Sequence, residues 1–253
     1  MNPGKISAVF LLVICLADAG HSQNLIVNGD FRAGNTGFST GYGFVTSGES
    51  VTPGTFGIRT NSQDFNPNYS TFVDPAGDGG PMLLLDGYAP GTPAWSETIN
   101  VSPNKNYLFS GWATPSDPPN AAVLQFEING AQIGGQYPLT STIAWTNFSN
   151  IWFSGANTQA TLSISDENTS YEAAGDDFAL DDLSFGLFPE LTIHLASHQA
   201  VLSWPTNNNY SLQSTTNLLS AWSAVTNVPV ATNGQFIVTN LLARPQKFYR
   251  LSQ

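Results

Sequence analysis

Two short patterns in the chain match catalytic motifs, but neither has the local structure that catalysis requires. The run Gly37-Phe38-Ser39-Thr40-Gly41 has the G-x-S-x-G form of a nucleophile elbow. That turn lies between a strand and a helix, and no helical pattern follows Gly41. His194 and His198 are four residues apart, which suits a metal on a helix, but their segment has the pattern of a strand running into a turn. We therefore predict that the protein is not an enzyme.

Paired carboxylates are a third route to catalysis, through glycoside hydrolysis. The candidates are Glu97, Glu127, Asp166, Glu167 and Glu172. Such hydrolases hold two carboxyl groups roughly 5 to 10 Å apart in an open cleft, and no spacing in this sequence marks out a pair. Glu97 shares a strand face with Trp95, where it is either buried with a partner or lines a concave binding face. A carboxylate-dependent glycoside hydrolase therefore remains an alternative function.

Aromatic side chains in polar loops are the main candidates for ligand binding. Sugar rings stack on aromatic faces while neighbouring polar groups reach their hydroxyls. Tyr42, Tyr69 and Tyr88 lie in segments rich in Gly, Asn and Pro, which are typical of loops. Trp95 opens an alternating run, so it belongs either to the core or to a binding face. We predict a carbohydrate site built from these four residues.

Charge and cysteine content exclude several other classes of function. The formal net charge is -11, so the chain lacks the basic surface that binds nucleic acid or anionic lipid. The acidity serves either a Ca²⁺ site or the solubility of an exported protein. Cys15 is the only cysteine and lies in the apolar N-terminal run. The mature chain therefore has no disulfide, zinc–thiolate site or cysteine nucleophile.

The N-terminus has the pattern of a Sec-type signal peptide. Lys5 precedes an apolar run from Ile6 to Leu16, which is too short to span a bilayer. Ala17-Asp18-Ala19 gives a small-x-small cleavage site, so residues 1–19 are predicted to be removed. No later apolar stretch has the length of a membrane span. We therefore expect a secreted, soluble mature protein.

Short alternating runs between turn residues predict an all-β chain. The run 123–129 places Leu124, Phe126 and Ile128 on one face, and Asn129-Gly130 then forms a tight hairpin turn. Further strands are expected at 95–101, 107–113, 131–134, 145–153, 160–165 and 178–185. Strands of this length and spacing favour a β-sandwich or jelly roll over a parallel sheet.

A domain boundary is predicted near residues 187–190. Beyond it, β-like runs restart between turns rich in Asn, Ser, Thr and Pro, such as Pro205-Thr206-Asn207-Asn208-Asn209. We expect a small second β domain at 190–253. A domain of this size is only marginally stable alone, so it is expected to pack on its neighbour or on another partner.

The segment 24–187 resembles the galactose-binding-like jelly rolls, a fold that includes many carbohydrate-binding modules. The resemblance is carried by the opening Asn24-Leu25-Ile26-Val27-Asn28-Gly29-Asp30-Phe31 and the closing Asp177-Phe178-Ala179-Leu180-Asp181-Asp182-Leu183-Ser184-Phe185. Interior runs such as Trp95-Ser96-Glu97-Thr98-Ile99 and Tyr107-Leu108-Phe109-Ser110-Gly111-Trp112 are also similar. The resemblance implies a jelly-roll β-sandwich, while its ligand stays open because such modules bind many things.

The same resemblance implies a structural Ca²⁺ where the first and last strands lie together. The matching positions are Asn28, Asp30, Asp181 and Asp182. Ca²⁺ takes six to eight oxygen ligands, which Asp and Asn on converging strands supply. Arg32 departs from the family pattern, since its cation opposes a metal and could instead pair with Asp181 or Asp182. A second oxygen-rich loop, residues 74–80, is interpreted as a Gly-rich turn.

The C-terminal segment resembles a fibronectin-type-III-like module found at the end of exported bacterial proteins. The resemblance rests on Val201-Leu202-Ser203-Trp204-Pro205, on the run 210–218, on Trp222 and on the ending Phe248-Tyr249-Arg250-Leu251. It implies attachment to a cell-surface partner, or a packing role only. The sequence as a whole favours an exported, non-catalytic protein that binds a glycan or polysaccharide. A structural or adhesive surface protein without a sugar site is the alternative.

Overall fold

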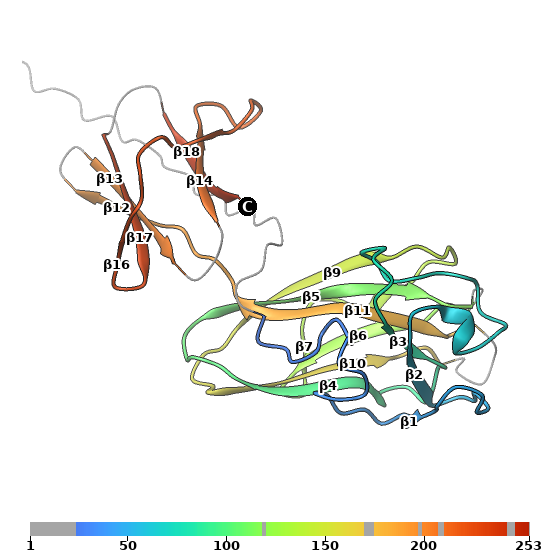
Figure 1. Ribbon diagram of the computed structural model, residues 1–253. Coiled ribbons are helices and arrows are strands. Elements are labelled where there is room, and N and C mark those ends of the chain that lie inside the picture. Colours follow the sequence, from blue (N-terminus) through green and yellow to red (C-terminus); the bar gives the residue numbers. More distant parts are fainter. Residues whose placement is uncertain are drawn as a thin grey trace, which may run out of the picture. The chain divides into compact units, whose positions relative to one another are not determined.

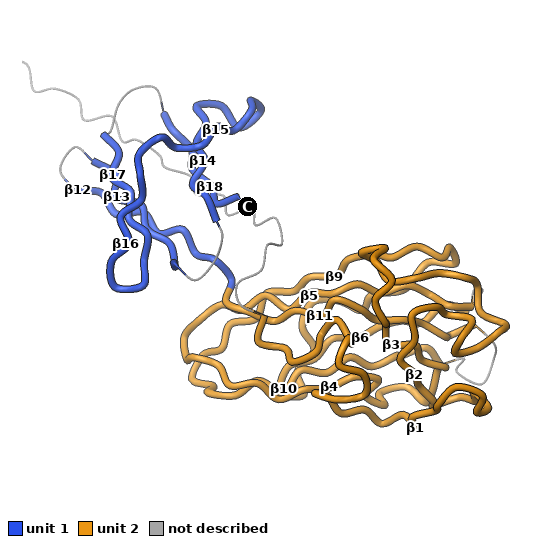
Figure 2. Tube along the Cα trace, viewed as in Figure 1, with its two compact units in different colours: residues 1–23, 188–253 blue, residues 24–187 orange. Residues whose placement is uncertain are grey.

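The computed structural model describes residues 24–117, 120–169, 175–196, 199–206, 210–241 and 246–252. The predicted signal peptide, His198 and Glu172 lie outside these residues. Within them, no helix has the length and apolar character needed to cross a membrane. The described chain divides into a larger unit, Asn24–Leu187, and a smaller unit that begins at Phe188 (Figure 2).

The larger unit is a β-sandwich of two sheets (Figure 1). The first sheet has the strand order β1 (Gly43–Phe44), β2 (Thr55–Arg59), β3 (Met82–Leu85), β11 (Phe178–Leu187), β5 (Asn106–Pro115) and β9 (Thr146–Phe153). The second has the order β4 (Pro93–Asn100), β10 (Gln159–Asp166), β6 (Val123–Ile128) and β7 (Ala131–Gln132), and β8 (Tyr137–Pro138) also pairs with β6. The only helix among the described residues is the 3-10 turn η1 (Ser62–Asp64). The predicted all-β class is confirmed.

Alternation of apolar and polar residues explains why these segments form strands. In β6, Leu124, Phe126 and Ile128 are buried while the residues between them are half-buried. Asn129 and Gly130 both have positive φ, 55° and 72°, as the tight hairpin turn requires. The turn predicted from the sequence is therefore present, and it joins β6 to β7.

Aromatic side chains fill the space between the two sheets. Phe126 of β6 stacks on Phe148 of β9, with ring centroids 4.2 Å apart. Phe109 of β5 meets the ring of Phe126 edge-on at 6.0 Å. Because these contacts join strands of different sheets, they hold the layers of the sandwich together.

The opening and closing segments of the larger unit lie side by side. The Asn24 side chain donates to the Leu183 carbonyl and accepts from the Phe185 amide, both at 2.9 Å. The amide of Leu183 donates to the carbonyl of Gly29 at 2.9 Å. A Cβ at Gly29 would lie 2.0 Å from the carbonyl oxygen of Leu183, so only glycine fits here. The two bracketing motifs therefore close the sandwich on itself.

The smaller unit is also built of strands. One sheet has the order β12 (Thr192–Ala196), β13 (Gln199–Pro205), β17 (Gln235–Leu241) and β16 (Val230–Thr232). The other has the order β15 (Ser223–Ala224), β14 (Ser211–Thr215) and β18 (Phe248–Ser252). Its own core includes Leu202, Trp204 and Leu251. His194 lies on β12, so its segment is the strand that the sequence predicts, and its side chain is exposed.

Candidate functional site

The loop tyrosines predicted to bind sugar lie toward one end of the sandwich. Tyr42 and Tyr88 contact edge to face, with ring centroids 5.9 Å apart. Tyr69 donates its hydroxyl to the carbonyl of Leu85, at the end of β3, at 3.3 Å. Their exposures differ: Tyr88 is 39% exposed, Tyr42 6% and Tyr69 2%. Tyr88 is therefore the tyrosine of this group with a ring open to a ligand.

Trp95 belongs to the core. Its side chain is 0% exposed and packs against Phe109 of the opposite sheet, at a centroid distance of 6.1 Å. Of the two alternatives open for this residue in the sequence, the structure has the core one. A ring without an exposed face offers no stacking surface to a sugar.

Four aspartates surround the tyrosines at the ends of three strands. Asp86 follows β3 and Asp177 precedes β11, and these strand ends lie together because Leu85 pairs with Phe178. The amide of Gly87 donates to Asp177 Oδ1 at 3.0 Å. Asp176 adjoins Asp177, and Asp166 ends β10 of the other sheet. We call these four residues, with Tyr42, Tyr69 and Tyr88, the aspartate–tyrosine cluster.

The local backbone holds the carboxyl group of Asp166 and leaves room for that of Asp176. Asp166 Oδ1 accepts from the amides of Val123 at 2.8 Å and Asn168 at 2.9 Å. A Cβ at Gly87 would lie 2.1 Å from the Asp176 carboxyl group. The absence of a side chain at Gly87 therefore creates the space that the Asp176 carboxyl occupies.

Burial raises the pKa of every carboxyl group in the cluster. The pKa of Asp176 is about 8 and that of Asp86 about 7, because burial is reinforced by the charge of Asp177. Burial raises the pKa of Asp166 and of Asp177 to about 6, against the opposing effect of backbone N–H donors. The cluster therefore offers both protonated carboxyl groups and carboxylates near neutral pH.

Three oxygens of the cluster are buried without a hydrogen-bond partner. They are Asp166 Oδ2, Asp176 Oδ2 and the hydroxyl of Tyr42. The residues that carry them are 1%, 2% and 6% exposed. A buried polar group without a partner costs about 1–3 kcal/mol, so three of them together are an unusual feature of a folded core.

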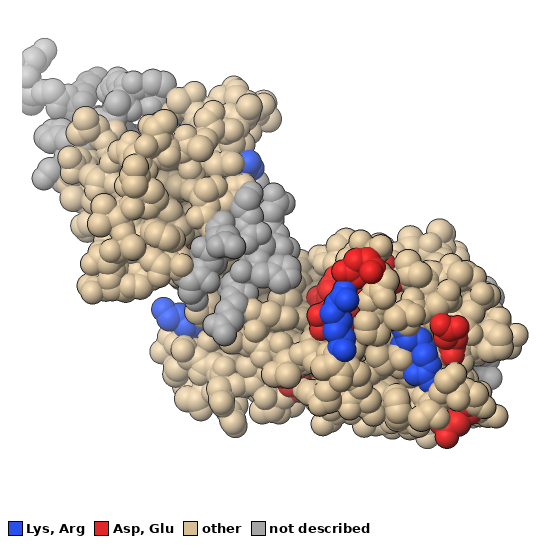
Figure 3. Space-filling model, in the orientation of Figure 1, with Lys and Arg blue, Asp and Glu red and all other residues tan. Residues whose placement is uncertain are grey.

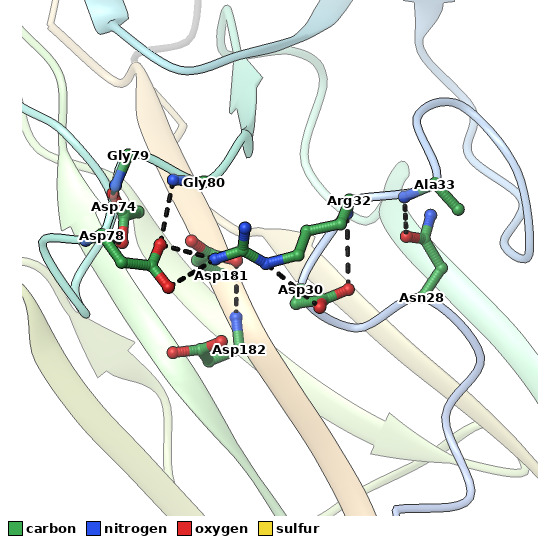
Figure 4. Close-up of polar contacts among 10 residues, drawn as sticks. All are labelled: Asn28, Asp30, Arg32, Ala33, Asp74, Asp78, Gly79, Gly80, Asp181 and Asp182. Atoms are coloured by element: carbon green, nitrogen blue, oxygen red, sulfur yellow. Dashed lines mark hydrogen bonds and ion pairs between the residues drawn. The ribbon is translucent and has the colours of Figure 1, made fainter.

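Arg32 lies beside one of the positions expected to hold a structural Ca²⁺, Asp30 (Figure 4). Arg32 Nη2 lies 2.5 Å and 2.6 Å from the two carboxylate oxygens of Asp78. Its Nε lies 3.5 Å from Asp30. The guanidinium thus pairs with Asp78 and Asp30, and not with Asp181 or Asp182 as considered from the sequence.

The other expected Ca²⁺ ligands are engaged in local structure. Asn28 bonds the carbonyls of Gly34 and Thr36, both at 2.8 Å, and accepts from Ala33. Asp181 Oδ1 accepts from the amide of Asp182 at 2.8 Å. Arg32 thus competes with a metal for Asp30, and a Ca²⁺ site at Asn28, Asp30, Asp181 and Asp182 stays a prediction.

The second oxygen-rich loop is a turn organised by its first residue. The Asp74 carboxylate accepts from the amides of Asp78 at 3.2 Å and Gly79 at 2.9 Å. Gly77 and Gly79 both have positive φ. This geometry presents Asp78 to Arg32 (Figure 4).

The described carboxylates that the sequence offers for hydrolysis have separate hydrogen-bond partners. Glu97 accepts from the amide of Val27 at 3.1 and 3.2 Å, so its partner is the backbone of the opening segment. Glu127 accepts from the Gln125 side chain on β6, and Glu167 from the hydroxyl of Ser165. Asp166 alone of the described candidates belongs to the aspartate–tyrosine cluster.

Surface charge on the sandwich is mixed. On the face drawn in Figure 3, its basic side chains do not gather into a patch, and acidic side chains lie beside some of them. Arg32 with Asp30 and Asp78 is one such group.

Sequence reasoning missed Asp86, Asp176 and Asp177. Their signal was weak: each lies next to a predicted strand and beside a glycine or another aspartate. The structure places Trp112 half-buried on β5, paired with Asn147 of β9 and with Asp181 of β11.

No known protein family matches this chain, and no curated protein matches it. One similar solved structure is TmCBM61 in complex with beta-1,4-galactotriose, with 13% identity, 66% of this chain and 100% of that chain covered, and a TM-score of 0.44. Another is the Stig cyclase Fisc from Fischerella sp. TAU, with 11% identity, 66% and 97% covered, and a TM-score of 0.47. A third is the sugar-binding EclA C-terminal domain, with 16% identity and a TM-score of 0.33. That match covers 36% of this chain and 64% of the EclA domain.

Proposed function

We propose that the sandwich unit binds a glycan at the aspartate–tyrosine cluster and does not cleave it. The observation that carries the proposal is the position of Tyr88. Tyr88 is 39% exposed as a residue, yet its ring is held against the ring of Tyr42. A Cβ at Gly54 would lie 2.7 Å from the Tyr88 ring, so the backbone at Gly54 packs closely against this ring. An exposed ring fixed in this way is a rigid surface for a sugar.

The carboxyl groups next to Tyr88 supply the polar half of such a site. Asp86 lies two residues before Tyr88 and is half-buried. Sugar hydroxyls both donate and accept hydrogen bonds. With a pKa of about 7, Asp86 is present at neutral pH both as an acceptor carboxylate and as a donor carboxyl group. Polar groups of this kind orient a ligand while the aromatic ring provides contact area.

Export and surface attachment complete the proposed function. The predicted signal peptide at residues 1–19 supports secretion. The smaller unit has its own core, which suits an accessory module that attaches the sandwich to a cell-surface partner. The glycan would then be bound outside the cell.

The test is a glycan-binding measurement on the chain without its predicted signal peptide. A glycan panel identifies a ligand, and calorimetry compares the wild type with Tyr88→Ala. Removing an aromatic anchor should weaken binding by about tenfold or more. The matched control is Phe153→Ala, which removes another aromatic ring that is 58% exposed, on β9.

Three results decide between the alternatives. Weaker binding by Tyr88→Ala, with Phe153→Ala unchanged and the oligosaccharide recovered intact, supports the proposal. Absence of binding to every glycan favours the structural or adhesive alternative and overturns it. Recovery of shortened oligosaccharide overturns the non-catalytic part and favours the hydrolase.

A further inference from the structure

The three unpartnered oxygens of the aspartate–tyrosine cluster share one chemical need. Asp166 Oδ2, Asp176 Oδ2 and the Tyr42 hydroxyl are buried and accept no hydrogen bond. An ionised carboxylate oxygen can only accept, so it needs a donor proton or a cation. The Tyr42 hydroxyl adds a neutral oxygen, which comes from a different segment and is not part of the acidic set.

The charges that act on these groups are all of one sign. Tyr42 interacts electrostatically with Asp166, Asp176, Asp86 and Asp177. The other charged side chains that act on the carboxyl groups of the cluster are Asp117 and Glu167. None of these groups is basic, in contrast to Asp30 and Asp78, which share Arg32. Among the described residues, Arg32 pairs with Asp30 and Asp78, and no ion pair is formed with the carboxyl groups of the aspartate–tyrosine cluster.

The unpartnered oxygens are held by structure that does not depend on a ligand. Two backbone amides donate to Asp166 Oδ1, and Asp166 Oδ2 remains without a hydrogen-bond partner. The Asp176 carboxyl fills the space above Gly87, where no side chain fits. Tyr42 is fixed through its ring contact with Tyr88. A site held in this way is preorganised for an ion.

The donor set selects the kind of ion. Ca²⁺ binds carboxylate and neutral oxygens in flexible geometry, whereas Mg²⁺ demands a near-ideal octahedron. No imidazole or thiol is among the residues of the cluster, which disfavours zinc and other transition metals. Within the described parts of the chain, no three His, Cys, Asp or Glu side chains already form a metal-holding group. Asp166 Oδ2, Asp176 Oδ2 and the Tyr42 hydroxyl supply three of the six to eight oxygens that Ca²⁺ takes, and water supplies the rest.

We propose that Asp166, Asp176 and the hydroxyl of Tyr42 form a Ca²⁺ site at the end of the sandwich. The site is distinct from the one that the bracketing motifs implied. Ca²⁺ binding at this site does not require a glycan, so a failure of the proposed sugar binding would not refute it.

The experiment measures Ca²⁺ alone. The chain without its predicted signal peptide is stripped with EGTA and then titrated with CaCl₂ by calorimetry, and its Tm is followed as Ca²⁺ is added. A ligand that binds only the folded state raises the Tm with its concentration. We expect saturable binding, a Tm rise that EGTA reverses, and a weaker response to MgCl₂.

Variants assign the binding to these residues. Asp176→Asn should lower Ca²⁺ affinity by tenfold or more, and Tyr42→Phe should lower it by a smaller factor. Asp30→Asn, which removes a carboxylate beside Arg32, should leave the affinity unchanged. If Asp176→Asn does not fold, Tyr42→Phe carries the test, because it removes one oxygen and keeps the ring.

Two outcomes would overturn the inference. One is the absence of Ca²⁺ binding by the stripped wild-type chain. The other is equal loss of affinity in Asp30→Asn and Asp176→Asn, which would place the ion at the bracketing motifs or on the general acidic surface. A chain that binds Ca²⁺ but no glycan of the panel would overturn the proposed function and support this inference.

Discussion

Replacing Asp181 with Asn should remove part of the pH dependence of folding. Asp181 lies on β11 and is 3% exposed. Burial raises its pKa to about 8, and the charges of Asp182, Asp74 and Asp30 add to the rise. In the unfolded chain the pKa of an aspartate is about 3.9. Between these two values the folded protein keeps a proton that the unfolded chain has released.

The sign and size of the effect follow from this difference. A raised pKa in the folded state contributes stability at low pH that is lost as the pH rises toward 8. A shift over roughly four pH units, at about 1.4 kcal/mol per unit, sets an upper bound near 5 kcal/mol. Buried sites relax when they ionise, so we expect roughly half of that bound.

The assay is urea denaturation of the wild type and Asp181→Asn at pH 4, 6 and 8. Asparagine keeps the oxygen that accepts the amide of Asp182, a bond of 2.8 Å in the wild type. The two proteins should be nearly equal in stability at pH 4, and the variant more stable by about 2–3 kcal/mol at pH 8. Asp64→Asn, at an exposed aspartate of η1, should follow the wild-type profile. Parallel profiles for the wild type and Asp181→Asn would refute the reasoning.

Two further predictions concern packing and surface charge. Gly111→Ala should lower the free energy of unfolding by about 1–3 kcal/mol, because a Cβ there would lie 2.6 Å from Leu183 and 2.7 Å from Phe148. Gly135→Ala meets nothing within 4 Å, and in the same denaturation assay it should be neutral; equal losses in both variants would contradict the overpacking argument. Arg32→Gln should change the Tm little, because the side chains of Arg32 and Asp78 are 50% and 56% exposed. A large fall in Tm that added salt does not diminish would show that this ion pair is more than a surface contact.

Local patterns predicted the strands well because a strand is recognisable from its own residues. The alternation of Leu124, Phe126 and Ile128 identified β6, and Asn129-Gly130 identified the turn after it. The bracketing motifs were expected to lie together, and the bonds from Asn24 to Leu183 and Phe185 bring them there. In each case the residues that form the recognisable sequence pattern also form the strand, turn or hydrogen bonds that the pattern predicts.

Burial of the loop aromatics could not be predicted in the same way. Tyr42, Tyr69 and Tyr88 are all in polar segments, but only Tyr88 keeps an exposed ring. Segments that read as loops can fold back onto a sheet: Tyr69 packs with Phe65, Met82 and other residues in a small core of its own. A loop composition describes the backbone and leaves the position of the side chain open.

The sequence by itself determined that the protein is an all-β chain of short strands, since period-two patterning and turn residues are local properties. Only the tertiary structure decided where the acidic residues meet. Gly87 and Asp177 are 90 positions apart and become neighbours because β3 pairs with β11. The partner of Arg32 was likewise decided by the turn that presents Asp78. Charge coupling and burial depend on distances across the fold, and those distances are set by strand pairing between remote parts of the chain.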